Sequence, residues 1–100
     1  MKKTTKFRHL LKSPEILMLP GAHDALTARI IDQCGFNAYL AGGYSATAGL
    51  LGAPDISQLS MTEMADFYAR LSDASPLPIL ADADTGYGGP TNVVRTVRSY

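Results

Sequence analysis

The most informative part of the sequence is PLPILADADTGYGGP, residues 76–90. Two prolines lead into a short apolar run, residues 79–81, which predicts a buried strand. Asp82 and Asp84 follow at its carboxyl end, and the glycine-rich residues 85–89 predict a loop. Pro90 suits the first turn of a helix. Strand, loop and helix in this order form one β/α unit.

The same order of elements is predicted at the start of the chain. Residues 15–19 are almost wholly apolar and stop at a Pro-Gly pair, as expected of a strand buried on both faces. Asp24 can cap the following helix, which runs to about Cys34. Cys34 itself is expected to be a small buried hydrophobe rather than a redox residue. The apolar residues expected on one face of this helix are Leu26, Ile30 and Ile31.

A second unit lies between these two. Residues 36–41 form an apolar run, which predicts a strand ending at two glycines. Residues 44–57 are rich in Gly, Ala and Ser and lack a clean period, which is typical of a mobile or substrate-facing connection. The pattern Ser60-x-x-Glu63 is a capping box, and it begins a helix predicted over residues 61–73. The apolar face of that helix is formed by Met64, Phe67, Tyr68 and Leu71.

Two more helices are predicted at the ends of the chain. Residues 4–12 carry a narrow apolar stripe, and the helix from Pro90 carries another, formed by Val93, Val94, Val97 and Tyr100. A helix followed by three strand-helix units predicts a parallel α/β sheet with right-handed crossovers. Because three apolar strands leave edges and a face uncovered, we expect a fragment of a larger barrel or open α/β domain. A small oligomerising α/β module without enzymatic activity is the alternative.

The composition excludes several classes of partner. The 100 residues are 46% hydrophobic and carry nine Lys plus Arg against nine Asp plus Glu, so no net charge attracts nucleic acid or an anionic membrane. No apolar run reaches the ~20 residues of a membrane helix. Residues 1–13 also lack the continuous apolar run of a secretory signal. We therefore expect a cytoplasmic protein that binds a small molecule.

Asp82 and Asp84 are the candidate metal ligands. Side chains at positions i and i+2 of a strand point to the same side, and these two lie at the carboxyl end, where parallel-sheet enzymes place their sites. Two neighbouring carboxylates repel unless a cation or a proton lies between them, and a hard ion such as Mg²⁺ is the usual solution. The alternative is that one aspartate caps the next turn while the other is solvated.

Two further candidate segments follow the second predicted strand. In residues 39–43 the paired glycines let the backbone approach a ligand, and their N–H groups can bind a carboxylate, although a tight turn also explains such a pair. Tyr39 fits a core position as well as a catalytic one. Pro54 restricts the backbone before it, so Asp55 either reaches a defined position or begins an Asx turn.

Four motifs, in this order and spacing, resemble the isocitrate lyase and phosphoenolpyruvate mutase superfamily. They are PGAHDAL (residues 20–26), YLAGG (39–43), LGAPD (51–55) and ADADTGYG (81–88). The likeness runs from about residue 15 to residue 100. Similar members of the superfamily are 2-methylisocitrate lyases, 2,3-dimethylmalate lyases, carboxyvinyl-carboxyphosphonate phosphonomutases and oxaloacetate-acting enzymes.

The resemblance implies a (β/α)₈ TIM barrel that forms a homotetramer. Residues 1–100 would be the N-terminal part of its single domain. Residues 1–13 would supply the N-terminal helix, and residues 15–100 about the first three β/α units. The implied cofactor is Mg²⁺, with Mn²⁺ as the alternative ion, bound largely through water.

The site residues are carried over from the family one by one. Asp82 and Asp84 match the metal-site aspartates, and Asp55 matches a catalytic carboxylate beside metal and substrate. Tyr39 matches a tyrosine next to the substrate. The residues that match the loop binding the substrate carboxylate are Ala41, Gly42 and Gly43.

The implied reaction is cleavage of a C–C bond next to the carboxylate of a 2-hydroxy or 2-oxo acid, through an enolate intermediate. A phosphonomutase or phosphonate hydrolase acting on a phosphoenolpyruvate-like ligand is the alternative. Many of the lyases have Ser in place of Ala41, so a hydrogen bond is lost here, which disfavours tricarboxylic substrates. The lyases also carry a Lys-Lys-Cys-Gly-His loop whose cysteine serves as the acid. Residues 1–100 contain no such loop, and we expect them to be inactive alone.

Overall fold

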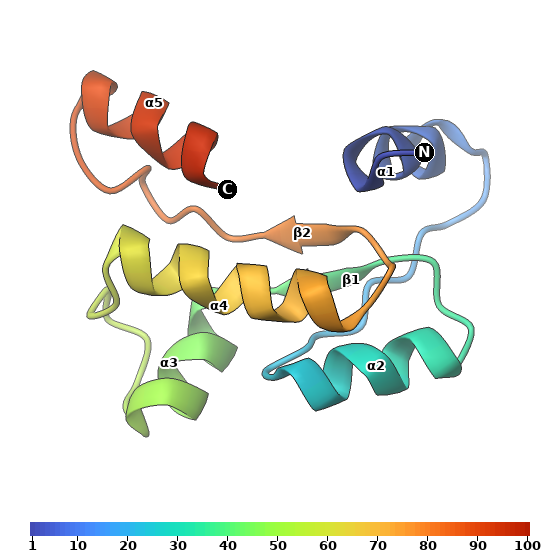
Figure 1. Ribbon diagram of the computed structural model, residues 1–100, viewed down its shortest axis with the longest axis horizontal. Helices are drawn as coiled ribbons and strands as arrows, with labels where there is room; N and C mark the ends of the chain where they lie inside the picture. Colours follow the sequence, from blue (N-terminus) through green and yellow to red (C-terminus); the bar gives the residue numbers. More distant parts are fainter.

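The computed structural model describes residues 1–100 and contains five helices and two strands (Figure 1). In chain order the elements are α1 (Lys3–Lys12), α2 (Ala25–Gln33), β1 (Tyr39–Ala41), α3 (Gly43–Leu51), α4 (Met61–Ala74), β2 (Ile79–Ala81) and α5 (Pro90–Ser99). The helices predicted over residues 4–12, 24–34 and 61–73 and from Pro90 are confirmed to within a residue or two. None of them is long and apolar enough to span a membrane.

The two strands are parallel neighbours. Tyr39 lies opposite Ile79, and Ala41 lies opposite Ala81. Both carboxyl ends point toward the end of the molecule that carries α3 and the loop into α5, whereas α1 lies toward the other end (Figure 1). The loops after β1 and β2 therefore meet at one edge of the sheet, as expected for parallel strands.

The strand predicted for residues 15–19 is wrong. Residues 15–19 form no strand, and only a single parallel bridge follows them, between Gly21 and Leu40. Leu40 N–H donates to the Pro20 carbonyl and Ala22 N–H donates to the Leu40 carbonyl, both at 2.9 Å. The next bond toward the N-terminus would need an N–H at position 20, and proline has none. Residues 20–22 therefore lie beside β1 without forming a regular strand, and the pairing does not extend back into residues 15–19.

The core lies between the sheet and the helices α2 and α4. Tyr39 and Ala41 are fully buried on this side of β1. The predicted face of α4 is confirmed, because its four apolar residues are all buried. The capping box is also present: Ser60 Oγ accepts from Glu63 N–H at 3.2 Å, and Glu63 Oε1 accepts from Ser60 N–H at 3.1 Å. Helix α4 thus starts at a fixed residue and packs through one apolar face.

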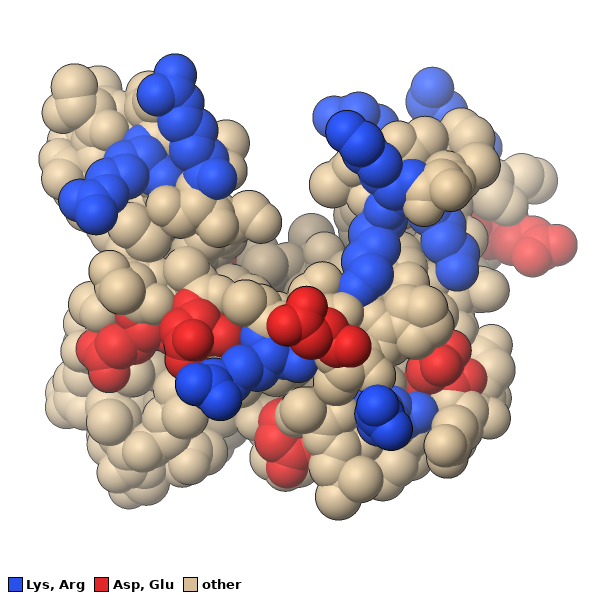
Figure 2. All heavy atoms as spheres, in the orientation of Figure 1, with Lys and Arg blue, Asp and Glu red and all other residues tan.

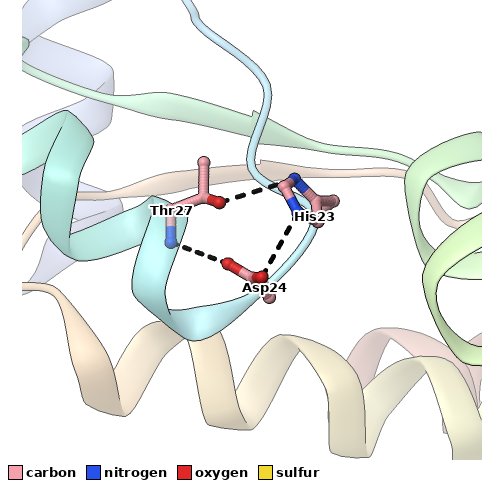
Figure 3. A network of polar contacts seen from close by, with 3 residues as sticks. All are labelled: His23, Asp24 and Thr27. Carbon is pink, nitrogen blue, oxygen red and sulfur yellow. Dashed lines mark hydrogen bonds and ion pairs between the residues drawn. The ribbon is translucent and has the colours of Figure 1, made fainter.

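Helix α2 begins as predicted, and of its predicted apolar face only Ile31 is buried. Asp24 Oδ1 accepts from Thr27 N–H at 2.7 Å, which lowers the pKa of Asp24, and His23 lies 3.2 Å from the other carboxylate oxygen (Figure 3). The buried residues are Ala28 and Ile31, whereas Leu26 is 67% exposed. The small Ala28 side chain suits a close approach of α2 to its neighbours, so the packed stripe is rotated from the predicted one.

The prediction that Cys34 is buried is wrong. Cys34 is the C-cap of α2, and its side chain is exposed. The chain turns away immediately afterwards at Gly35, whose φ is +88°. A residue at this turn is directed to solvent, because the helix no longer holds it against the core.

Residues 44–57 are only partly irregular, because α3 spans Gly43–Leu51. The sequence of α3 has no clean apolar period because many of its own side chains are small. Only Ala46 and Thr47 are buried. Thr47 Oγ1 donates to the Gly43 carbonyl at 2.6 Å. Gly52 then ends the helix in the left-handed conformation, with a φ of 60°. The prediction of a loop holds only for the part after this glycine.

Helices α1 and α5 lie outside the core. The predicted apolar face of α5 is largely exposed, because Val94 and Val97 face solvent and only Thr96 is buried. In the view of Figure 2, basic side chains project from α1 and α5 at the top, whereas the body formed by α2 to α4 carries both acidic and basic side chains. Lys3 docks α1 onto the end of α4, since its Nζ donates to the carbonyls of Ser72 and Ser75.

Candidate active site

The loops after β1 and β2 enclose a cavity of about 140 Å³, which we call the carboxylate cavity. Its lining residues are Gly43, Thr47, Asp55, Ser57, Leu59, Met64, Asp82, Asp84 and Tyr87. Four of the residues predicted for the site are among them, namely Gly43, Asp55, Asp82 and Asp84. The structure thus brings together residues from three separate sequence motifs at the carboxyl end of the sheet.

Asp82 is the best-fixed residue of the cavity. Its Oδ2 accepts from Gly43 N–H at 3.2 Å, and its Oδ1 accepts from Asp84 N–H at 2.7 Å. Its own N–H donates to the Ala41 carbonyl at 3.2 Å. Tyr68 of α4 donates its hydroxyl to the Asp82 carbonyl at 2.7 Å. Side chain and backbone of Asp82 are therefore held from β1, α3 and α4 at once.

Asp55 approaches the same point from the other loop. A Cβ placed on Gly43 would lie 3.2 Å from Asp82 Oδ2 and 3.4 Å from Asp55 Oδ2. Both carboxylates therefore converge on the N-terminus of α3, where the partial positive charge of the helix favours anions. The absent side chain at Gly43 is a condition for this approach, because any Cβ there would crowd Asp82.

Asp82 and Asp84 follow the strand, as predicted, but Asp84 does not keep the extended geometry that would point both side chains to the same side. Strand β2 ends at Ala81, and Asp84 follows in a turn with a φ of 48°. The Asp82 carboxylate caps this turn through the Asp84 N–H, so one element of the capping alternative is also present. Asp84 Oδ2 accepts from Ser57 Oγ at 2.9 Å.

The cavity also collects the unusual backbone of the chain. Three residues other than glycine have a positive φ, and all three line it: Ser57, Asp84 and Tyr87. Such conformations are uncommon for these residue types and concentrate at functional sites. The backbone at Ser57 and Tyr87 thus marks the cavity in addition to its carboxylates.

The loop that carries Tyr87 packs closely against α5. A Cβ on Gly86 would lie 2.5 Å from a Val93 methyl group, and one on Gly88 would lie 2.7 Å from Asn92. Thr96 Oγ1 donates to the Gly86 carbonyl at 2.8 Å. Two glycines therefore let the loop lie flat on the helix and leave Tyr87 at the cavity.

Tyr39, Ala41 and Gly42 do not line the cavity. Ala41 is buried at the end of β1, and Gly42 is the N-cap of α3. Tyr39 is fully buried in the core, and its hydroxyl has no hydrogen-bond partner. Burial raises the pKa of Tyr39 to about 12. The predicted carboxylate-binding amide of Gly43 is instead bonded to Asp82.

Ser57, Thr47 and Tyr87 line the cavity although the sequence did not predict them there. Ser57 lies two positions after Asp55, and Tyr87 lies between two glycines of the motif ADADTGYG, residues 81–88. Both positions carried a signal, which was proximity to a candidate acid or to paired glycines. Thr47 carried none, because it lies in α3, which was not predicted.

A larger cavity of about 370 Å³ lies between α1, α4 and α5 over β2. Its charged lining residues are Lys3 and Asp73. Lys3 is engaged with α4, and burial lowers its pKa. This space therefore lacks the converging carboxylates that distinguish the smaller cavity.

The donor set of the carboxylate cavity fits a hard cation. Carboxylate oxygens are the ligands that Mg²⁺ prefers, and one or two of them plus several waters are a usual set. No three Asp, Glu, His or Cys side chains are close enough to enclose an ion directly. The residues present therefore suit an ion that keeps water in its shell.

Comparison with known proteins shows which enzymes the chain is similar to. The chain is 45% identical over 100 residues to the 2,3-dimethylmalate lyase of Eubacterium barkeri, covering all of this chain and 35% of that protein. It is 46% identical over 95 residues to the 2-methylisocitrate lyase of Halalkalibacterium halodurans, covering 93% and 31%. The solved structure of an oxaloacetate acetylhydrolase matches with a TM-score of 0.93 and 38% identity, over 99% of this chain and 36% of that one.

The chain thus spans about a third of the length of the relatives it matches. Its fold is that of the N-terminal helix and first β/α units of the TIM barrel of these relatives, which confirms the predicted fold class. The sequence profile of phosphoenolpyruvate phosphomutase matches residues 7–100. The chain therefore belongs to the phosphoenolpyruvate phosphomutase family, within the isocitrate lyase and phosphoenolpyruvate mutase superfamily.

Proposed function

We propose that the complete protein is a magnesium-dependent lyase that cleaves a C–C bond next to the carboxylate of a 2-hydroxy or 2-oxo acid. The observation that carries the proposal is the convergence of Asp55, Asp82 and Asp84 on one cavity at the carboxyl end of the strands. The named relatives act on dimethylmalate, methylisocitrate and oxaloacetate, all of them small carboxylic acids.

Each aspartate has a separate role in this proposal. Asp82 and Asp84 hold Mg²⁺, or Mn²⁺ in its place, with water completing the shell. A bound Mg²⁺ supplies positive charge that stabilises the negative charge developing on the substrate. Asp55 faces the same space and moves a proton, with Tyr39 as the second candidate for proton transfer.

The substrate carboxylate binds at residues 41–43 in this proposal. Gly43 N–H is already bonded to Asp82 Oδ2, at the long distance of 3.2 Å. A substrate carboxylate would share or replace this contact at the N-terminus of α3. Ala41 lacks a hydroxyl, so recognition there falls to the backbone.

A second candidate is phosphonomutase or phosphonate hydrolase activity on a phosphoenolpyruvate-like ligand. The family match favours it, because the matching profile is that of phosphoenolpyruvate phosphomutase. We also place the protein in the cytoplasm as a homotetramer, in line with the superfamily resemblance. The exposed apolar side chains of α5 agree with burial against further protein.

Oxalate binding tests the lyase proposal. Oxalate is a planar mimic of a pyruvate enolate with two chelating oxygens, so the complete protein should bind it much more tightly with Mg²⁺ than with EDTA. Calorimetric titration measures both affinities. Asp82→Ala and Asp84→Ala should abolish the difference and the magnesium-dependent activity. Asp84→Ala should change the melting temperature little because that residue is exposed. Asp82→Ala should lower it further, because the Gly43 and Asp84 N–H groups lose their acceptor.

Asp66→Ala is the matched control. Asp66 is an exposed aspartate that pairs with Arg70 on the outer face of α4, away from the cavity residues. Its removal should leave oxalate binding unchanged. Equal oxalate affinity with and without Mg²⁺ in the unaltered protein would rule out the metal-dependent mechanism.

A further inference from the structure

Ser57 lies at the carboxylate cavity in a conformation that disfavours serine. Its φ is 60°, in the left-handed region that glycine adopts freely and other residues adopt only when their surroundings hold them. It lies in the loop between α3 and α4, two residues after Asp55. The loop therefore keeps an unfavourable backbone at a point where glycine would relieve it.

The side chain of Ser57 gives a reason for keeping serine there. Its Oγ donates to Asp84 Oδ2 at 2.9 Å, which joins residues 27 positions apart. Asp84 is exposed and lies in a turn, so without a partner its carboxylate can rotate between rotamers. The hydroxyl selects one rotamer and leaves Oδ1 with no protein partner.

A neutral donor suits this position. Lys or Arg would bring a positive charge that competes with a cation for Asp84, whereas a hydroxyl orients the carboxylate without neutralising it. The contact also ties the loop that carries Asp55 to the turn that follows Asp82. One hydrogen bond therefore fixes the relative placement of two parts of the cavity.

We propose that Ser57 is a positioning residue of the metal site, which orients the Asp84 carboxylate toward the bound cation while its own backbone stays strained. The proposal rests on the metal role that we propose for Asp84. It assigns to Ser57 an effect on magnesium affinity that is separate from its effect on stability.

Two substitutions separate these effects. Ser57→Ala and Ser57→Gly both remove the hydroxyl, so in the complete protein both should weaken Mg²⁺ binding by roughly 10-fold, as for other residues that orient metal ligands. Glycine also relieves the backbone strain, so Ser57→Gly should melt about 2 °C above Ser57→Ala. Calorimetry with Mg²⁺ alone measures the affinity, and a thermal melt measures the stability.

Ser60→Ala is the control in the same segment. Ser60 caps α4, and its Oγ contacts Glu63 rather than a cavity residue. Losing this cap should lower the melting temperature without changing Mg²⁺ affinity. Stability loss near the loop is thereby distinguished from loss of Asp84 orientation.

The outcomes separate the two proposals. Normal Mg²⁺ affinity in either Ser57 variant, with Mg²⁺ bound by the unaltered protein, overturns the role of Ser57 and leaves the proposed function intact. Absence of Mg²⁺ binding in the unaltered protein overturns the proposed function, and the role of Ser57 with it. Ten-fold weaker binding in both variants, with Ser60→Ala unchanged, supports the proposal.

Discussion

The buried face of α4 and the rim of the carboxylate cavity lie side by side but are built differently. On α4 the apolar residues recur at helical spacing, a capping box fixes the first turn, and Leu71 is 1% exposed. At the rim, three residues other than glycine hold a positive φ, and carboxylates stand close together. The α4 core follows the local preferences of its residues, whereas the rim departs from them. Such departures are expected where selection acts on chemistry rather than on stability.

The largest expected difference between the two regions is in stability. Leu71→Ala leaves a cavity in the core, so it should lower the free energy of unfolding of the complete protein by about 3 kcal/mol. Leu71 lines no part of the carboxylate cavity, so Mg²⁺ affinity of the folded protein should not change. Denaturant unfolding and calorimetry measure the two quantities. A marked loss of Mg²⁺ affinity would show that the two regions are not independent.

Tyr39 tests the difference between core and cavity, because it is a core residue for which we also propose a role in the site. The pKa of Tyr39 is about 12 in the folded protein, against about 10 when unfolded. Below pH 10 both states keep the proton, and from pH 10 to 12 the unfolded state loses it first. Stability should therefore fall as the pH rises through this range, by at most about 3 kcal/mol from this residue. Burial also raises the pKa of Tyr68 and Tyr100, which adds to the fall.

Tyr39→Phe isolates the contribution of that hydroxyl. The group is buried without a hydrogen-bond partner, so its removal at neutral pH should leave the free energy of unfolding unchanged or raise it. The fall above pH 10 should become smaller. Lost turnover in this variant would support the proton-transfer role of Tyr39, and normal turnover would make it a core residue only. A clear loss of stability would contradict the description of the hydroxyl as unpaired.

The sequence predicts the α4 core well because its signals are local. The capping box and the spacing of four apolar residues both lie within one helix, and the structure has both. The same rules fail for α3, whose small side chains give no period although alanine favours helix. They also fail for residues 15–19, where the missing N–H of Pro20 counts for more than the apolar run.

The rim was predictable only in part. The positions of Asp82 and Asp84 after a strand pointed to the carboxyl end of the sheet. Pro54 already made Asp55 a candidate, and the superfamily resemblance supplied its role beside metal and substrate. The contact between Ser57 and Asp84 joins residues of two different loops, so no spacing rule reveals it. The turn that holds Asp84 depends on a bond from its N–H to Asp82, which the i and i+2 pattern does not contain.

The smallest expected effect comes from Tyr68, which belongs to both regions. Its ring is buried in the α4 core and lies 5.6 Å from Phe67 and 5.1 Å from Tyr100, between ring centroids. Its hydroxyl donates to the Asp82 carbonyl at 2.7 Å. Tyr68→Phe keeps the ring and removes this bond, so the free energy of unfolding should fall by about 1 kcal/mol. Because the Asp82 backbone loses one of its restraints, Mg²⁺ affinity should fall with it, by less than in the Ser57 variants.

Tyr100→Phe is the matched control, since it removes a hydroxyl from the same aromatic group. The Tyr100 hydroxyl contacts only the Tyr87 hydroxyl, at a long 3.4 Å, and does not touch Asp82. This variant should therefore leave Mg²⁺ affinity unchanged. If Tyr68→Phe lowers stability but binds Mg²⁺ normally, the Tyr68 bond belongs to the core alone. If both quantities fall together only in Tyr68→Phe, α4 supports the site through this one bond, and the core contributes to the chemistry by holding the Asp82 backbone in place.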